Sequence, residues 1–242
     1  MNNIVSCLCI TYKRTSFLKR SIRCFEDQIY PNKELLIVYQ DNDEITEAFV
    51  DENPGYFKLI LKDGKIIQEK EGDSSIKFIR VSNDLTLGEK RNLSIDYATG
   101  DFVCIWDDDD FHSEVRLKHQ MEFLIFSGKA ANVLANLTLF DERTGKFYFS
   151  PQRNNGWEGS LLCKKSEIGK YHHLNKKEDT PVLIDLYERD LLSIMEEPEL
   201  YIYHFHASNT SGMSHLDEML NYSIPVPYDI QQRMIYFTQN IE

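Results

Sequence analysis

The sequence predicts an α/β fold in which a mostly parallel sheet is joined to a smaller mixed sheet. In the first half, short apolar runs alternate with segments whose apolar residues recur at helical spacing, as in a parallel sheet covered by helices. After about residue 130 this alternation ends, and short apolar runs follow one another around turn residues, which predicts a mixed or antiparallel sheet. The 242 residues, 42% of them hydrophobic, suffice for one domain of this kind.

The first half is predicted to contain four buried strands, which are the apolar runs 4–10, 35–39, 76–81 and 102–106. Apolar spacing and helix-forming residues predict helices at 18–29, 45–53, 88–97 and 113–126. Residues 56–70 differ, because two β-like runs flank the turn sequence Lys62-Asp63-Gly64. We interpret this segment as a hairpin inserted between the second and third parallel strands.

The second half is predicted to begin with an antiparallel hairpin formed by Val133–Phe140 and Lys146–Ser150, followed by a strand at Trp157–Cys163. Pro181, preceded by polar capping residues, predicts the start of a helix whose apolar face comprises Val182, Leu183, Leu186 and Ile194. Leu200–Phe205 is the last predicted strand. The final twenty residues, which include Pro225 and Pro227, are interpreted as a partly ordered tail or a partner-docking segment.

Four consecutive aspartates, Asp107–Asp110, follow the apolar strand 102–106 directly. Open α/β sheets bind their ligands at the carboxyl ends of their strands. Adjacent carboxylates repel one another, and a hard cation with oxygen ligands, Mg²⁺ or Mn²⁺, offsets this repulsion. The alternative is a solvated acidic turn that caps the helix beginning near Ser113. The buried strand before the run favours a metal site.

The helix predicted at 88–97 carries Lys90 and Arg91 in its first turns. Basic side chains together with the free amides of a helix start suit a phosphate group. The alternative for this pair of residues is a solvent-exposed position without a ligand.

Composition restricts the partners and the compartment. A formal net charge of −12 and the lack of a basic stripe argue against nucleic-acid binding. Five scattered cysteines, mostly within apolar runs, predict reduced core thiols. Neither a signal-peptide pattern nor an apolar run approaching about 18 residues is found. We therefore expect a cytoplasmic protein that could associate peripherally with the inner face of the membrane.

Several segments in order resemble the family 2 glycosyltransferases, which have the GT-A fold. They are SCLCITYKR, YPNKELLIVYQDND, GEKRNLSIDYATGDFVCIWDDDD, GWEGSLLCKKS and EDT, and together they span roughly residues 4–190. The resemblance implies a Rossmann-like parallel sheet and a smaller acceptor-side sheet within one domain, residues 1–242. It also implies a nucleotide-sugar-binding half at about 1–112 and an acceptor-binding half at about 113–205, which leaves 206–242 as a C-terminal extension.

The activity implied is an inverting, metal-dependent transfer of a sugar from a nucleoside diphosphate to an acceptor hydroxyl. Donor-binding residues implied by the resemblance are Thr11, Tyr12, Arg14, Arg91, Asp107 and Asp108. After the second strand the family usually has Asp-Asp or Asp-Gly, whereas this chain has Gln40-Asp41. Either side chain could therefore face the base, which leaves uridine, guanosine and thymidine open, with a UDP-sugar favoured.

The metal, Mn²⁺ or Mg²⁺, is expected at Asp107 and Asp109, with His206 as a further ligand or a donor to the diphosphate. A shift of one residue would instead select Asp108 and Asp110. A lone histidine at a strand end is more often structural, and this remains the alternative for His206.

Asp179 is the candidate general base, because attack on the sugar requires a carboxylate that accepts the acceptor's proton. Glu178 is the nearest alternative, and Asp179 could instead only cap the helix at Pro181. Trp157 and Glu158 match the segment that lines the donor sugar and acceptor in the family, where Trp157 could stack on a sugar. The alternative for Trp157 is a position in the core.

These observations predict an enzyme that acts on a glycan or lipid-linked glycan acceptor during synthesis of a bacterial-type surface polysaccharide or glycoconjugate. The first alternative is a non-catalytic module that binds a sugar nucleotide or glycan beside a larger polymerase. Such a module has no need of a base at Asp179. A nucleotidyltransferase is a further alternative, weakened by the absence of a glycine-rich phosphate loop with a following lysine near residue 11.

Overall fold

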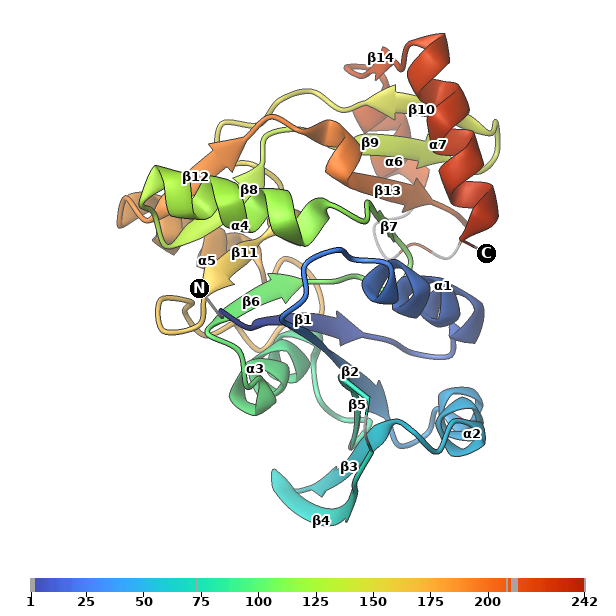
Figure 1. Cartoon of the computed structure of the whole chain (residues 1–242), viewed down its shortest axis with the longest axis vertical. Helices are drawn as coiled ribbons and strands as arrows, with labels where there is room; N and C mark the ends of the chain where they lie inside the picture. The colour runs from blue at the N-terminus through green and yellow to red at the C-terminus, as the bar shows by residue number, and fades with distance from the viewer. Residues whose placement is uncertain (1–2, 73, 208, 210–212, 242) are drawn as a thin grey trace.

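The computed structural model describes residues 3–72, 74–207, 209 and 213–241, without the side chains of 213–216. Within this part of the chain, nine strands form a large sheet in the order β12-β8-β11-β6-β1-β2-β5-β3-β4, and five form a small sheet in the order β14-β10-β9-β13-β7. The two sheets lie in different parts of one α/β unit, with the N-terminal strands in the large sheet (Figure 1). The predicted architecture of a large, mostly parallel sheet and a smaller second sheet is confirmed.

The centre of the large sheet is parallel, since β1 pairs in parallel with both β2 and β6, and β5 pairs in parallel with β2 and β3. The large-sheet strands of the first half are β1 (Val5–Ile10), β2 (Lys33–Gln40), β3 (Phe57–Lys62), β4 (Lys65–Lys70), β5 (Ile76–Val81) and β6 (Phe102–Ile105). The helices of this half are α1 (Thr15–Glu26), α2 (Glu44–Glu52) and α3 (Leu87–Tyr97). The inserted hairpin predicted at 56–70 is β3 and β4, which pair antiparallel at the edge of the sheet.

The second half adds strands to both sheets. To the large sheet it contributes β8 (Ala131–Leu134), β11 (Leu162–Lys164) and β12 (Leu192–Met195). The small sheet consists of β7 (Phe111–His112), β9 (Thr138–Asp141), β10 (Lys146–Phe149), β13 (Tyr201–Phe205) and β14 (Ile224–Pro225). The remaining helices are α4 (Arg116–Ser127), α5 (Thr180–Glu188), α6 (Met213–Leu220) and α7 (Tyr228–Asn240), with short 3-10 helices η1 (Glu158–Ser160) and η2 (Pro198–Leu200).

Four predictions for the second half are wrong in part. The run 133–140 is two strands, β8 and β9, which belong to different sheets, so the hairpin is β9 with β10 alone. The strand predicted at 157–163 is η1 followed by the shorter β11. Ile194 lies in β12 and not on helix α5. The C-terminal tail is instead largely α7, which packs Met234 into the main core.

The core lies on both faces of the large sheet. On one face, side chains of α1 and α4 share a core cluster with Cys7 and Cys9 of β1; on the other, side chains of α3 and α5 share a cluster with Leu8 and Leu36. All five cysteines are buried and unpaired, as predicted. In the described part of the chain, no helix is both long enough and apolar enough to cross a membrane.

Candidate active site

A cavity of about 880 Å³ lies at the carboxyl ends of the parallel strands. Its walls come from the segments after β1 and β6, the start of α3, the segment around η1, the segment leading into α5, and strand β13. The structure brings thirteen of the residues predicted from the sequence into this lining: Thr11, Tyr12, Arg14, Lys90, Arg91, Asp107, Asp108, Asp109, Asp110, Trp157, Glu158, Glu178 and Asp179.

The four aspartates do not share one environment. Asp108 and Asp110 are buried, with 4% and 1% of their surface exposed. Asp108 accepts a hydrogen bond of 2.7 Å from the Thr11 hydroxyl. Asp110 accepts one from the Tyr201 hydroxyl and one of 2.8 Å from the backbone N–H of His204. The side chains of Asp107 and Asp109 are less buried, at 31% and 14% exposed, so exposure alternates along the run.

Burial and mutual repulsion shift the pKa values of these carboxyls. Burial, followed by the charge of Asp109, raises the pKa of Asp108 to about 7 and that of Asp110 well above its usual range. Burial also raises the pKa of Asp107. For Asp109, burial alone would raise the pKa, but the hydrogen bond to His206 and the charge of Arg14 outweigh it and lower the pKa. The cluster therefore has an electrostatic cost that bound positive charge would reduce.

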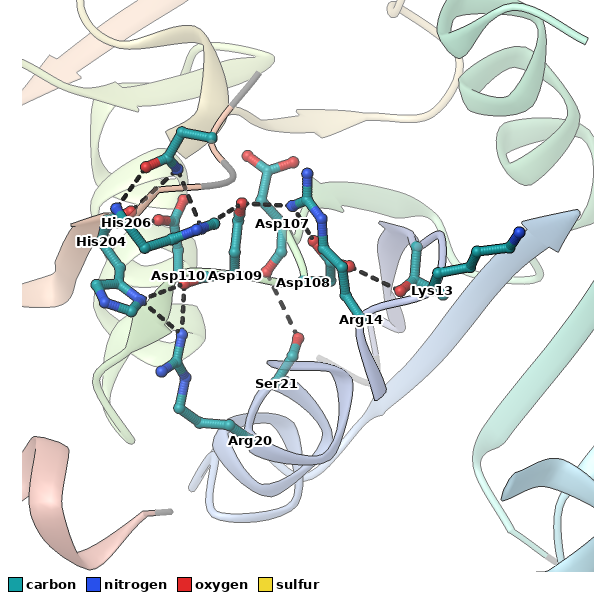
Figure 2. Close-up of polar contacts among 12 residues, drawn as sticks. Lys13, Arg14, Arg20, Ser21, Asp107, Asp108, Asp109, Asp110, His204 and His206 are labelled. Carbon is teal, nitrogen blue, oxygen red and sulfur yellow. Dashed lines mark hydrogen bonds and ion pairs between the residues drawn. The ribbon is translucent and has the colours of Figure 1, made fainter. Parts of the chain in front are cut away.

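Cationic and imidazole groups surround Asp109 on two sides (Figure 2). The Arg14 guanidinium lies 2.6 Å from Asp109 Oδ2 and 3.3 Å from Asp108 Oδ1. His206 Nε2 lies 3.1 Å from the same Oδ2 atom of Asp109. The structure thus places His206 beside the aspartates, although it comes from the end of β13, 97 residues along the chain.

Arg20 of α1 bonds to the backbone of the aspartate run. Arg20 Nη2 donates to the carbonyl oxygen of Asp109 at 2.5 Å and contacts His204 Nδ1 at 3.0 Å. Because a guanidinium only donates, this nitrogen of His204 is the acceptor and the imidazole is neutral. Burial, with the charge of Arg20 adding to it, lowers the pKa of His204 to about 3.

Arg91 links the aspartate run to the segment before α5. It is buried, its Nε donates to Glu178 Oε1 at 3.0 Å, and its Nη2 lies 3.4 Å from Asp107 Oδ1. Burial alone would lower the pKa of Arg91, but Asp107 and the other nearby acidic groups outweigh burial and raise it. Among the described residues, its buried Nη1 has no hydrogen-bond partner. Arg91 thus retains donor capacity beside the cavity.

The expectation that the start of α3 offers free amides to a phosphate is wrong. The first three N–H groups of the helix already have acceptors: Leu87 bonds to Asn175 Oδ1 at 3.0 Å, Gly88 to the Leu174 carbonyl at 3.0 Å, and Glu89 to the Thr86 hydroxyl at 3.3 Å. The segment 172–177 closes this helix end, which leaves only the side chains of α3 to reach a ligand.

Glu178 and Asp179 are adjacent in sequence but differ in their contacts. Glu178 is 2% exposed and engaged by Arg91. Asp179 occupies the N-cap position of α5, yet its side chain makes no capping hydrogen bond. In the part of the chain that the structure describes, its carboxylate has no hydrogen-bond or ion-pair partner, and it lines the cavity. The geometry therefore does not support capping as the role of this side chain.

Trp157 and Glu158 belong to a contact cluster that includes Arg153, a residue the sequence analysis missed. The Arg153 guanidinium carbon lies 3.3 Å from the centre of the Trp157 ring. Glu158 accepts hydrogen bonds of 3.3 Å from both Arg153 and the Thr180 hydroxyl. Because Arg153 covers one face of an indole that is only 7% exposed, sugar stacking could use only what remains of the ring. Nothing in the residue spacing before Trp157 marks Arg153.

Gln40 and Asp41 are not among the residues that line the cavity. Asp41 is exposed, and its backbone N–H bonds to the Val81 carbonyl. Asp43 is the buried acid of this segment, and it caps α2 through Thr46 and accepts a 2.6 Å bond from the Lys13 N–H. The base-reading role of Gln40 or Asp41 stays a prediction.

The donor set around Asp109 suits a hard divalent cation, since it combines carboxylate oxygens with one imidazole. In the described parts of the chain, no three His, Cys, Asp or Glu side chains already form a ligand cage. Sites that bind Mg²⁺ commonly use one or two carboxylates and complete the coordination with substrate phosphates. Asp107 and Asp109 fit that kind of site.

Solved structures with a similar fold are glycosyltransferases. Residues 1–349 of S. aureus TarS in complex with UDP-GlcNAc match with a TM-score of 0.63 and 15% identity, over 85% of this chain and 60% of that one. The mannosyltransferase PcManGT from Pyrobaculum calidifontis, in complex with GDP-Man and Mn²⁺, matches with a TM-score of 0.58 and 12% identity, over 86% and 58%. The chain spans about three fifths of the length of these two solved chains. The fold is therefore the GT-A fold of nucleotide-sugar transferases.

The family model "Glycosyl transferase family 2" matches residues 6–175. The chain belongs to this family, which confirms the resemblance found in the sequence motifs. Among curated proteins, none matches the sequence significantly.

Proposed function

We propose that this protein transfers a sugar from a nucleoside diphosphate sugar, with UDP-sugars favoured, to an acceptor hydroxyl with inversion at the sugar. The observation that carries the proposal is the Asp179 carboxylate, which has no hydrogen-bond partner among the described residues and lines the same cavity as Asp107 and Asp109. A non-catalytic binding module would have no use for such a carboxylate.

The residues that line the cavity have separate roles in the proposed reaction. Asp179 takes the proton from the acceptor hydroxyl as its oxygen attacks the sugar. Arg91, which has an unused Nη1 donor, binds the diphosphate and stabilises the charge that develops as it leaves. Mn²⁺ or Mg²⁺, held by Asp107 and Asp109 with His206 beside them, would supply Lewis-acid stabilisation of the same charge. Greater accessibility of Asp107 and Asp109 supports this pair over Asp108 and Asp110 as ligands.

Trp157 and Glu158 are proposed to line the sugar and acceptor side of the cavity. A glycan or lipid-linked glycan is the proposed acceptor, in surface-polysaccharide or glycoconjugate synthesis at the cytoplasmic face of the membrane. The family membership and the resemblance in sequence support this setting.

Calorimetric titration with UDP, GDP, TDP and CDP, each with and without Mn²⁺, tests the donor site. We expect tight binding of one diphosphate, dependent on metal, and loss of the metal dependence in Asp109→Asn. Asp101→Asn is the matched control, because Asp101 precedes the same strand and is exposed at its opposite end. If none of the four diphosphates binds in either condition, the transferase proposal is wrong.

A further inference from the structure

Lys90 is a second cation in the cavity wall, one residue before Arg91. Only 7% of its surface is exposed, and it lies in the first turns of α3. Arg91 has carboxylate partners in Asp107 and Glu178. The Lys90 side chain, by contrast, makes no hydrogen bond or ion pair with any residue that the structure describes.

An ammonium that is partly removed from water and has no partner in the protein carries a desolvation cost. Burial lowers the pKa of Lys90, and no neighbouring charge acts against that shift. If the position served only to pack α3, methionine would fill it without the cost of desolvating a charge. The cost is recovered if a ligand supplies the missing acceptor when it enters the cavity.

The position of Lys90 restricts what that ligand can be. It lines the same cavity as Thr11, whose hydroxyl is already engaged by Asp108. The carboxylates of Asp107, Glu178 and Asp179 line this cavity too, but none of them pairs with Lys90 or shifts its pKa. Because an ammonium has three donors and no acceptor, its partner must be an acceptor oxygen or an anion.

We propose that Lys90 binds an oxygen of the donor nucleotide, either on a phosphate or on a ring carbonyl of the base, and so helps to select the nucleotide. This inference rests on the proposed function, because it takes a nucleoside diphosphate as the ligand of the cavity. The proposal also means that the start of α3 contacts the ligand through a side chain. Acceptors in the segment 172–177 already bond the first two N–H groups of this helix.

Lys90→Met tests this inference in the full-length chain. Without ligand, we expect the variant to have a higher midpoint of thermal unfolding than the wild type, because it no longer desolvates an unpaired charge. In calorimetric titration with Mn²⁺ and the preferred diphosphate, we expect about 10- to 100-fold weaker binding, the usual size of a lost hydrogen bond to a charged group. A merely structural lysine would lower the unfolding midpoint and leave the affinity unchanged.

Lys118→Met is the matched control, since it removes the same charge from an exposed position on a helix outside this cavity. It accounts for the change in net charge, and its nucleotide affinity should equal that of the wild type. Titration with UDP, ADP and pyrophosphate then separates the two acceptors. A phosphate contact weakens all three in Lys90→Met, whereas a base carbonyl contact weakens UDP and leaves ADP and pyrophosphate unchanged.

Equal affinity of Lys90→Met and the wild type for every nucleotide overturns the role of Lys90 while leaving the proposed function in place. If the wild type itself binds no nucleotide, the proposed function fails and the inference about Lys90 fails with it. The two failures are therefore distinguished by the wild-type titration alone.

Discussion

The large sheet buries carboxylates at both of its ends, and their surroundings are opposite. At the amino end, Glu34 accepts hydrogen bonds of 2.6 Å from the Ser6 hydroxyl, 2.6 Å from the Thr99 N–H and 2.7 Å from the Lys77 ammonium. Burial alone would raise the pKa of Glu34, but the bonds from Lys77 and Ser6 lower it. This carboxylate stabilises the fold.

At the carboxyl end, Asp108 and Asp110 are as deeply buried as Glu34, but burial and the charge of Asp109 raise their pKa values. Repulsion within the run is therefore not fully compensated by the protein itself. The comparison shows that the neighbouring donors and charges, and not burial alone, set the direction of a buried carboxylate's pKa shift.

The largest expected effect is on chemistry at the carboxyl end. Asp179→Asn removes the proposed base, so the turnover number should fall about 10²- to 10⁴-fold. Nucleotide and Mn²⁺ affinity should stay near wild type, because the change leaves Arg91 and the aspartate run intact. Steady-state kinetics with calorimetry measure both quantities. Asp185→Asn, on the exposed face of the same helix, is the control. Normal turnover by Asp179→Asn would rule out this base.

At the amino end, Glu34→Gln should lower the free energy of unfolding by about 2–3 kcal/mol, since it leaves Lys77 without its counter-ion in a buried network. Because the folded-state pKa of Glu34 is lowered, its contribution is present above its ordinary pKa of 4.5 and is lost as pH falls through the folded-state value. Urea denaturation at several pH values measures this. Glu52→Gln, at an exposed position, should change little. An unchanged acid dependence in Glu34→Gln would contradict the role given to Glu34.

A third change tests the close contact that shapes the carboxyl end. In Gly88→Ala, the added Cβ would lie 1.8 Å from the His172 carbonyl oxygen, so the segment 172–177 must shift. We expect a loss of about 1–3 kcal/mol in the free energy of unfolding and a lower turnover number, because Asp179 follows this segment. Gly169→Ala is the control, since its nearest neighbouring atom lies 3.9 Å away. If both variants behave alike, the contact is unimportant.

The smallest effect should have the opposite sign. Asp108→Asn retains an acceptor for Thr11 and removes a charge, so we expect a gain of about 1 kcal/mol in the free energy of unfolding at pH 8. Because the folded-state pKa is raised to about 7 from 3.8, the stability linked to Asp108 is present at low pH and is lost as pH rises through 7. The gain should therefore shrink by pH 5. If Asp108→Asn instead destabilises the protein at pH 8, the charged Asp108 carboxylate stabilises the fold, as Glu34 does.

The parallel half of the fold was predictable because its signals are local. The apolar run 76–81 is β5 itself, and the turn at Gly64 marks the β3–β4 hairpin. The single strand predicted at 133–140 was wrong because hydrophobicity does not show that Leu134 pairs in one sheet and Thr138 in the other. For α7 the signal was present: Ile230, Met234, Phe237 and Ile241 recur at helical spacing. Pro225 and Pro227 favour an irregular segment, but they precede the helix.

For the candidate site as well, the residues within local motifs were predictable and the contacts between distant segments were not. The sequence motifs placed Arg91, Asp107 and Asp179 in what proves to be one cavity, while their roles remain predictions. Contacts between distant segments could not be foreseen. The bond from Leu87 to Asn175 spans 88 residues, and only the folded chain shows that it closes the start of α3. The stacking of Arg153 on Trp157 depends likewise on the path of a loop.

The alternation within the aspartate run limits how such a run tolerates insertion and deletion. Asp108 and Asp110 are fixed to Thr11 and Tyr201, while Asp107 and Asp109 are more accessible. Losing one aspartate would leave three negative charges in place, yet it would change the distance from β6 of every residue that follows, because the run continues β6 as a turn. The position of each aspartate relative to β6 therefore carries more information than the number of acidic residues, and alignments of similar runs should preserve that position before they maximise matched aspartates.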